Sequence, residues 1–163
     1  MKIEENNDSF VIVDFDEFEA YYLACKLEKD GLRFYRRLDQ VSLEEKIKQT
    51  IKLLIQEELN HLIFFEQQLA LLRKEKEDFV EDNDLIANLN LGIFKLDEND
   101  INQFSDYNKI FTLAIKLEEK TILFYQQVQK NISTLLAQSA LAKIIDEEKK
   151  HKRLLESLIY NRG

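Results

Sequence analysis

The sequence contains no proline, no tryptophan, three glycines and a single cysteine among its 163 residues. Folds rich in strands and tight turns need far more turn residues, so this scarcity excludes them and favours long helices. One cysteine forms neither an internal disulfide nor a Cys-x-x-Cys metal site. No apolar run approaches the length of a membrane span, and residues 1–8 are too polar and acidic for a signal peptide. We therefore expect a cytoplasmic protein.

Charged and aliphatic side chains make up most of the sequence. Charged residues account for 33% and hydrophobic residues for 45%, a composition typical of amphipathic helices. The length suits one domain with a sizeable core, so residues 1–163 are expected to form a single domain. The net charge of −8 would repel nucleic acid and anionic membranes. We expect neither as a partner.

The apolar periodicity predicts four helices, over residues 14–38, 43–78, 106–130 and 133–160. Asp14 and Glu17 have capping-box spacing at the start of the first. The short links predict that the first two helices, and likewise the last two, form antiparallel hairpins. The long segment 79–104 then serves as the crossover between the hairpins. The sequence therefore predicts an all-α four-helix bundle.

The sequence contains only two histidines, and each closes a Glu-x-x-His motif. The motifs are Glu58 with His61 and Glu148 with His151, at an offset of 151 − 61 = 90 residues. Residues three apart on a helix lie on one face, about 4.5 Å apart along the axis. Each glutamate can therefore contact two metal ions while its histidine binds one of them.

The same offset of 90 residues reveals an internal repeat. Residues 24–35 are echoed by residues 114–125, so that Glu28 corresponds to Glu118. Each acid lies at the centre of an apolar helical stripe, and so does each Glu-x-x-His motif. Four carboxylates in a low-dielectric interior are very costly unless they are protonated or neutralised. Two divalent cations would balance four ionised glutamates.

The predicted metal ligands are Glu28, Glu58, His61, Glu118, Glu148 and His151. An oxygen-rich set with one imidazole per metal suits iron or manganese, whereas structural zinc prefers more cysteine or histidine. Glu57, Glu119 and Glu147 are each one residue from a ligand, so we expect them to point about 100° away, towards solvent. The alternative is a bundle that keeps the pattern but binds metal poorly.

Two tyrosines and the cysteine each allow two interpretations. Tyr35 and Tyr125 lie two turns after Glu28 and Glu118, on nearly the same face. They are either core aromatics with satisfied hydroxyls or donors of a hydrogen bond to a ligand carboxylate. Cys25 is interpreted as a buried small hydrophobe in preference to a redox thiol.

The order Glu, Glu-x-x-His, Glu, Glu-x-x-His, with Phe-Tyr after each lone glutamate, resembles the rubrerythrin branch of the ferritin-like superfamily. The resemblance runs from Glu17 to Ile159. It implies a pair of iron ions that reduces hydrogen peroxide or dioxygen, a role in oxidative stress, and a homodimer. A manganese or mixed iron–manganese pair fits the same ligands. By position, the terminal ligands are Glu28 and Glu118, the bridging ligands are Glu58 and Glu148, and His61 and His151 each hold one iron.

Two departures from the family pattern matter. Rubrerythrins proper carry a rubredoxin domain with four cysteines, so a chain with one cysteine needs an external electron donor such as a rubredoxin-type protein. They also carry an extra glutamate in the third helix, where this chain has Thr121, matched in the first helix by Gly31. The site is therefore expected to be more symmetric, and the small residues would leave room for bound peroxide.

These patterns leave three functions open. The first is a di-iron oxidoreductase that reduces hydrogen peroxide or dioxygen. The second is ferritin-like iron oxidation and storage, although no fifth helix is evident after Tyr160 to build a ferritin-type cage. The third is an interaction module with a vestigial site. Nothing in the sequence marks the substrate pocket of a hydroxylase.

Overall fold

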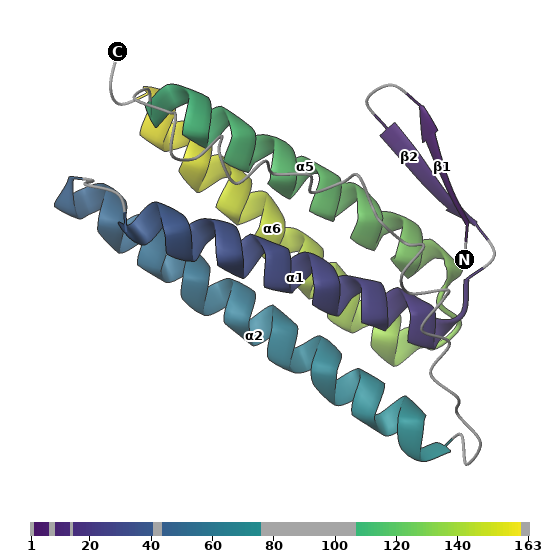
Figure 1. The fold of residues 1–163 in the computed structure, drawn as a ribbon. Coiled ribbons are helices and arrows are strands. Elements are labelled where there is room, and N and C mark those ends of the chain that lie inside the picture. The colour runs from purple at the N-terminus through teal and green to yellow at the C-terminus, as the bar shows by residue number, and fades with distance from the viewer. Residues whose placement is uncertain (1, 7–8, 14, 41–43, 76–106, 161–163) are drawn as a thin grey trace.

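The chain folds into a bundle of four long helices. The computed structural model describes residues 2–6, 9–13, 15–40, 44–75 and 107–160. The helices are α1 (Glu17–Gln40), α2 (Glu45–Glu75), α5 (Tyr107–Asn131) and α6 (Leu135–Tyr160). In Figure 1, α1 runs antiparallel to α2, and α5 runs antiparallel to α6. The all-α four-helix bundle predicted from the sequence is confirmed.

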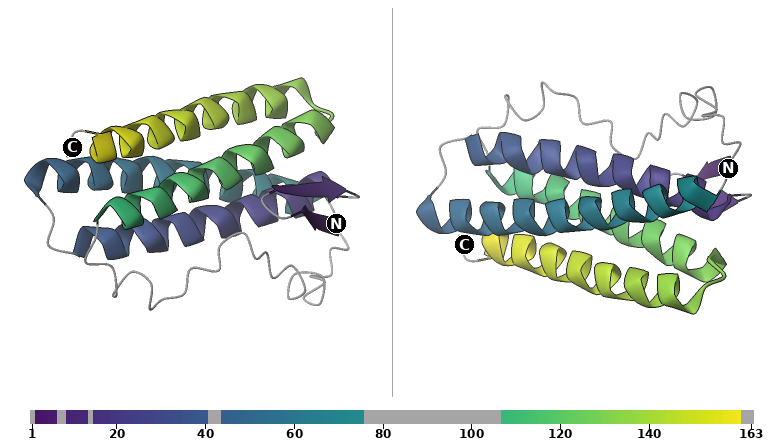
Figure 2. Two further views of the ribbon diagram at one scale, coloured as in Figure 1. Left: turned by 90° about the horizontal axis from the view of Figure 1, so that it is seen from above. Right: turned by 90° about the horizontal axis from the view of Figure 1, so that it is seen from below.

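The two hairpins pack side by side, so that α1 lies beside α5 and α2 lies beside α6 (Figure 2). α2 ends and α5 begins at opposite ends of the bundle, which is the arrangement that a crossover between the hairpins requires. The predicted crossover itself, residues 79–104, lies outside the described residues. The predicted helical residues 76–78 lie outside them as well.

The helix α1 begins three residues later than predicted, at Glu17 instead of residue 14. The carboxylate of Asp16 accepts a hydrogen bond from the backbone N–H of Glu19 at 2.8 Å, and the carboxylate of Glu19 accepts one from the backbone N–H of Asp16 at 3.0 Å. This reciprocal pair is a capping box. Asp14, the predicted partner of Glu17, lies outside the described residues, and Glu17 is the first residue of the helix.

A short β-hairpin that the sequence did not predict precedes the bundle. Strand β1 (Lys2–Asn6) pairs antiparallel with β2 (Ser9–Val13), with Asn6 opposite Ser9 at the turn. Ile12 is buried, and its backbone N–H donates a hydrogen bond of 2.8 Å to the side-chain oxygen of Gln127 on α5. The hairpin is thereby attached to the end of the bundle where α1 begins (Figure 1).

The core consists of two apolar clusters that lie in different halves of the bundle. The first includes Phe18, Tyr21, Leu62, Phe65, Phe124, Val128, Leu141 and Ile145. The second includes Phe34, Leu38, Ile47, Ile51, Ile110, Phe111, Leu155 and Leu158. On α2, α5 and α6, the buried acids and histidines fall between the residues of one cluster and those of the other. Among the helices that the structure describes, none combines the length and apolar character that membrane crossing needs.

Candidate metal centre

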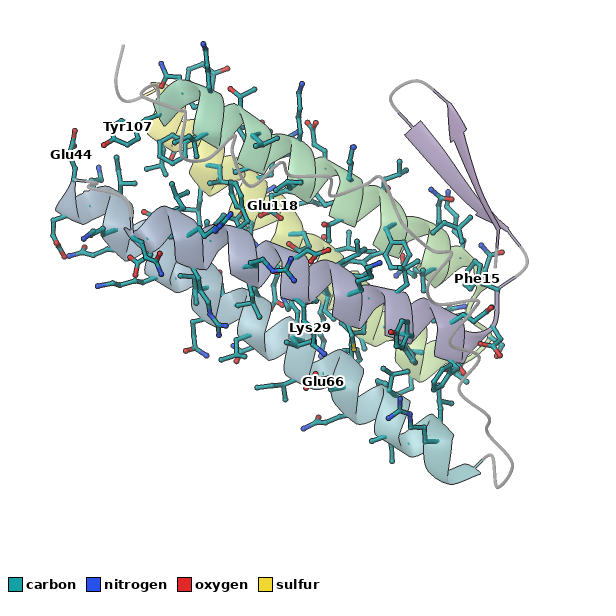
Figure 3. The ribbon with its side chains drawn as sticks, in the orientation of Figure 1. Phe15, Lys29, Glu44, Glu66, Tyr107 and Glu118 are labelled. Atoms are coloured by element: carbon teal, nitrogen blue, oxygen red, sulfur yellow. The ribbon has the colours of Figure 1, made fainter. Side chains whose placement is uncertain are left out.

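The six predicted ligands come together in the middle of the bundle, and none exposes more than 4% of its surface. Each helix supplies ligands to the centre. Helices α1 and α5 supply one acid each, and α2 and α6 supply one Glu-x-x-His motif each. Figure 3 labels Glu118, whose side chain points from α5 into the space between the helices. By contrast, Lys29 and Glu66 form an ordinary ion pair of 3.0 Å near the surface.

The six side chains form two overlapping groups that could each hold a metal ion. One contains Glu28, Glu58, His61 and Glu148, and the other contains Glu58, Glu118, Glu148 and His151. Within each group the potential ligand atoms lie within 4.8 Å of one another. Glu58 and Glu148 belong to both groups. The geometry thus provides two adjacent metal positions, with two carboxylates placed to bridge them and one acid and one imidazole at each end.

Both imidazoles present the same nitrogen to this centre. His61 Nδ1 lies 3.0 Å from Glu148 Oε1 and 3.8 Å from Glu28 Oε2. His151 Nδ1 lies 3.2 Å from a carboxylate oxygen of Glu58 and 3.9 Å from one of Glu118. The Nδ1 atoms are therefore the atoms that would ligate a metal at each position.

Unsatisfied polar atoms indicate that these residues fit a metal pair. Among the described residues, the buried side-chain atoms without a hydrogen bond include Glu28 Oε2, His61 Nδ1 and Glu148 Oε1; the last two lie 3.0 Å apart as an ion pair that lacks hydrogen-bond geometry. All three belong to one of the two four-residue groups. A buried polar atom without a partner is costly. A cation among these atoms would satisfy all three, and carboxylate oxygens with imidazole nitrogens are the donors that iron and manganese accept.

Two of the four acids have raised pKa values in the metal-free protein. Burial, followed by the negative charge of Glu58, raises the pKa of Glu28 well above its usual value. Burial and the charge of Glu148 do the same to the pKa of Glu118. Burial and the neighbouring negative charge thus favour the protonated form of both acids when no metal neutralises the site.

The other two acids are ionised and are balanced by the histidines. Burial alone would raise the pKa of Glu58 and Glu148, but the contacts from His61 and His151 outweigh it and hold both pKa values below normal. Burial would in turn lower the pKa of each histidine, yet these carboxylates raise it to about 12 for His61 and about 11 for His151. In the metal-free centre, the positive charges of the two histidines thus balance the negative charges of Glu58 and Glu148.

The two tyrosines cross the bundle to the terminal acids. The Tyr35 hydroxyl on α1 donates a hydrogen bond to Glu118 on α5, and the Tyr125 hydroxyl on α5 donates one to Glu28 on α1. Burial raises the pKa of each tyrosine well above its usual value, and any negative charge on the acid that it contacts raises it further. Both hydroxyls therefore keep their protons and orient the terminal carboxylates.

A cavity of about 10 Å³, roughly enough for one water-sized molecule, adjoins the centre between α1 and α5. Its lining residues are Leu27, Glu28, Gly31, Tyr35, Glu58, Leu117, Glu118 and Thr121. A Cβ atom added at Gly31 would lie 3.9 Å from the Glu58 carboxyl group, an ordinary contact distance. Packing therefore does not require glycine at this position. Alanine would fit and would stabilise the helix by up to about 1 kcal/mol. The glycine keeps space open beside the Glu58 carboxylate.

Sequence reasoning missed two residues that contact the histidines. Glu57 and Glu147 were expected to point to solvent, but Glu57 Oε2 lies 3.0 Å from His151 Nε2, and Glu147 Oε2 lies 2.9 Å from His61 Nε2. The predicted angle of about 100° between each of these side chains and the adjacent ligand glutamate agrees with helix geometry. That direction, however, leads to the neighbouring helix of the other hairpin. The offset 147 − 57 = 90 was the signal that could have identified them.

The remaining candidate side chains lie apart from the centre. Glu119 forms an ion pair of 2.7 Å with Lys152, and half of its side chain is exposed. Cys25 is buried. Burial, followed by the charge of Glu66, raises the pKa of its thiol to about 11, so it is an inert thiol at neutral pH.

Comparison with known proteins gives one family and one fold. The model of the rubrerythrin family matches residues 19–159. A solved structure from Thermotoga maritima, described provisionally as a ferritin-like diiron-carboxylate protein, superposes with a TM-score of 0.72. The two chains are 23% identical over 93% of this chain and 99% of that one, and this likeness establishes the ferritin-like fold. No curated protein gives a significant match.

Proposed function

Because this chain belongs to the rubrerythrin family, we propose that it is a di-iron oxidoreductase that reduces hydrogen peroxide, and more slowly dioxygen. The observation that carries the proposal is the pair of four-residue groups that share Glu58 and Glu148. At a site with two adjacent metal positions, each of two bound iron ions could give one electron to the same oxidant molecule.

Two bound iron ions would supply the electrons. The chain's own residues position the reactants and exclude water. The Tyr35 and Tyr125 hydroxyls hold the terminal carboxylates Glu118 and Glu28 in place. Tyr35 also lines the cavity beside the centre, and its hydroxyl is hydrogen-bonded to Glu118, which lines the same cavity. The two apolar clusters on either side of the centre exclude bulk water.

We further propose that the electrons come from a separate donor such as a rubredoxin-type protein, and that the chain forms a homodimer. The single cysteine of this sequence cannot build a four-cysteine iron site, and Cys25 is buried. Manganese in one or both positions fits the same donors.

An anaerobic Fe(II) titration of the metal-free protein tests the proposal. We expect saturation at about two irons per chain, the number that the shared-ligand geometry accommodates. Rapid mixing with oxidant should then oxidise the iron much faster with hydrogen peroxide than with dioxygen. Uptake far beyond two irons, with dioxygen as the faster oxidant, would instead support iron oxidation and storage. Absence of stoichiometric binding would exclude both functions.

Replacing Thr121 by leucine is expected to slow peroxide-driven oxidation by about tenfold or more, equivalent to at least about 1.4 kcal/mol. Thr121 is buried in the cavity wall, and the larger side chain would fill the space that we assign to the oxidant. Stopped-flow absorption measures the rate. Thr112→Leu is the control, because Thr112 is exposed on the same helix. An unchanged rate in Thr121→Leu, with two irons still bound, would place the oxidant elsewhere.

A further inference from the structure

Each histidine of the centre has a second carboxylate partner on its outer side. The Nε2 atom of His61 meets Glu147, and the Nε2 atom of His151 meets Glu57, at 2.9 and 3.0 Å. The Glu147 side chain is 44% exposed and that of Glu57 is 35% exposed, whereas the histidines are buried. These acids therefore lie at the boundary between the centre and solvent.

The chemistry of these contacts fixes which nitrogen can ligate. An ionised carboxylate only accepts hydrogen bonds, so the Nε2 atom facing it must carry the proton. When the imidazole has lost its other proton, the free lone pair is then on Nδ1, the atom that faces the centre. A histidine ligand whose second nitrogen is held by a carboxylate is oriented more strictly and binds metal more strongly.

The arrangement is reciprocal between the two hairpins. Glu57 on α2 holds the histidine of α6, and Glu147 on α6 holds the histidine of α2. Glu119 provides the contrast. It is also the sequence neighbour of a candidate ligand, but it pairs with a surface lysine. Adjacency to a ligand in the sequence is therefore not what brings Glu57 and Glu147 to the histidines. The packing of α2 against α6 does so.

We infer that Glu57 and Glu147 are positioning residues of the metal centre, which hold His151 and His61 with Nδ1 directed at the two metal positions. This inference rests on the proposed di-metal function. It assigns to two partly exposed acids a role in metal affinity that the ligand set alone does not indicate. Neither acid contacts the metal positions in the two four-residue groups.

Metal affinity of the full chain measures this role. We expect Glu57→Ala and Glu147→Ala each to weaken binding of Zn²⁺, used as a redox-inactive probe, by about 10–100-fold. Glu57→Gln and Glu147→Gln keep an acceptor oxygen and should lose less. Glu119→Ala is the matched control, because it removes the same charge one residue from a candidate ligand, and it should stay within about twofold of the unmodified chain.

Histidine NMR separates positioning from a general structural effect. With only two histidines in the chain, ¹⁵N-histidine labelling gives a spectrum of two imidazoles. In the Zn²⁺-loaded chain we expect a downfield, slowly exchanging Nε2–H signal from each. Glu57→Ala should abolish the slow exchange for His151 alone, and Glu147→Ala for His61 alone. Urea unfolding of the metal-free variants, the glutamine variants included, checks that each one folds.

The outcomes are distinguishable. If the unmodified chain binds no Zn²⁺ and no Fe(II), the di-metal function fails and this inference fails with it. If the unmodified chain binds two ions and the alanine variants bind them equally well, only the positioning role of Glu57 and Glu147 is overturned. Loss of both Nε2–H signals in either single variant would also contradict the one-to-one pairing.

Discussion

Loading two divalent metal ions into the metal-free protein near neutral pH is expected to release about four protons per chain, or about two per metal. Glu28 and Glu118 are neutral acids in the metal-free centre, because burial raises their pKa values. His61 and His151 are imidazolium ions, with pKa values raised to about 12 and about 11 by the adjoining carboxylates. All four groups must lose a proton to act as ligands.

The sign of the pH dependence follows from these protons. Below the raised pKa values the metal-free protein binds protons that the metal-bound protein does not, so low pH favours the metal-free form. The apparent affinity for each metal should therefore rise with pH by about 100-fold per unit. It should level off only where the metal-free groups lose their protons unaided.

Calorimetric titration with Zn²⁺ in buffers of different ionisation enthalpy counts the released protons directly. The same titration between pH 6 and 8 gives the slope of affinity against pH. A tenfold rise per unit would mean that only the histidines release protons, and that Glu28 and Glu118 are already ionised. An affinity independent of pH would contradict the charge distribution described for the centre.

Glutamine substitutions in the metal-free protein are expected to divide the four acids into two classes. Glu58→Gln or Glu148→Gln should destabilise the metal-free fold by about 3–5 kcal/mol, the cost of removing one partner from a buried ion pair. Each of these buried carboxylates balances the imidazolium charges from inside the centre. Its loss leaves the other buried carboxylate and the partly exposed Glu57 and Glu147 as the main counterions of the two buried imidazolium groups.

Glu28→Gln and Glu118→Gln should change the same stability by no more than about 1 kcal/mol. Glutamine has the shape of the neutral acid that already occupies these positions, and its amide oxygen can still accept the tyrosine hydroxyl. All four variants should nevertheless lose most of their metal affinity. Urea unfolding in the presence of a chelator, paired with Zn²⁺ titration, measures both quantities. Equal destabilisation by all four substitutions would refute the division.

Helix positions and the ligand set could be predicted because both depend on periodicity within a single helix. The spacing of Glu58 and His61 places them on one face whatever the neighbouring helices do. The offset of 90 residues then selects Glu118 over the adjacent Glu119, and the structure places Glu118 inside and Glu119 on Lys152.

The features that were missed depend on what lies beyond one helix. The angle that separates Glu57 from Glu58 is correct, but that angle alone does not show that α6 lies in its direction. The first capping box was ambiguous because Asp14 and Asp16 each have a glutamate three residues later, and only the backbone path decides between them. The β-hairpin rests on a short run from Ser9 to Val13 whose attachment to Gln127 is 115 residues away in sequence.

The reciprocal contacts across the bundle have an evolutionary consequence. The tyrosine of each hairpin donates a hydrogen bond to the terminal acid of the other hairpin. In the same way, Glu57 and Glu147 each contact the histidine of the other hairpin. Each of these contacts has an equivalent contact in the opposite direction between the two halves. Two identical copies of one helical hairpin, related by a twofold rotation, would therefore make all of them. Each half of the chain therefore supplies half of one centre, and an ancestral duplication of a single hairpin would account for this arrangement. Gly31 and Thr121 are the position of the cavity lining at which the two halves now differ.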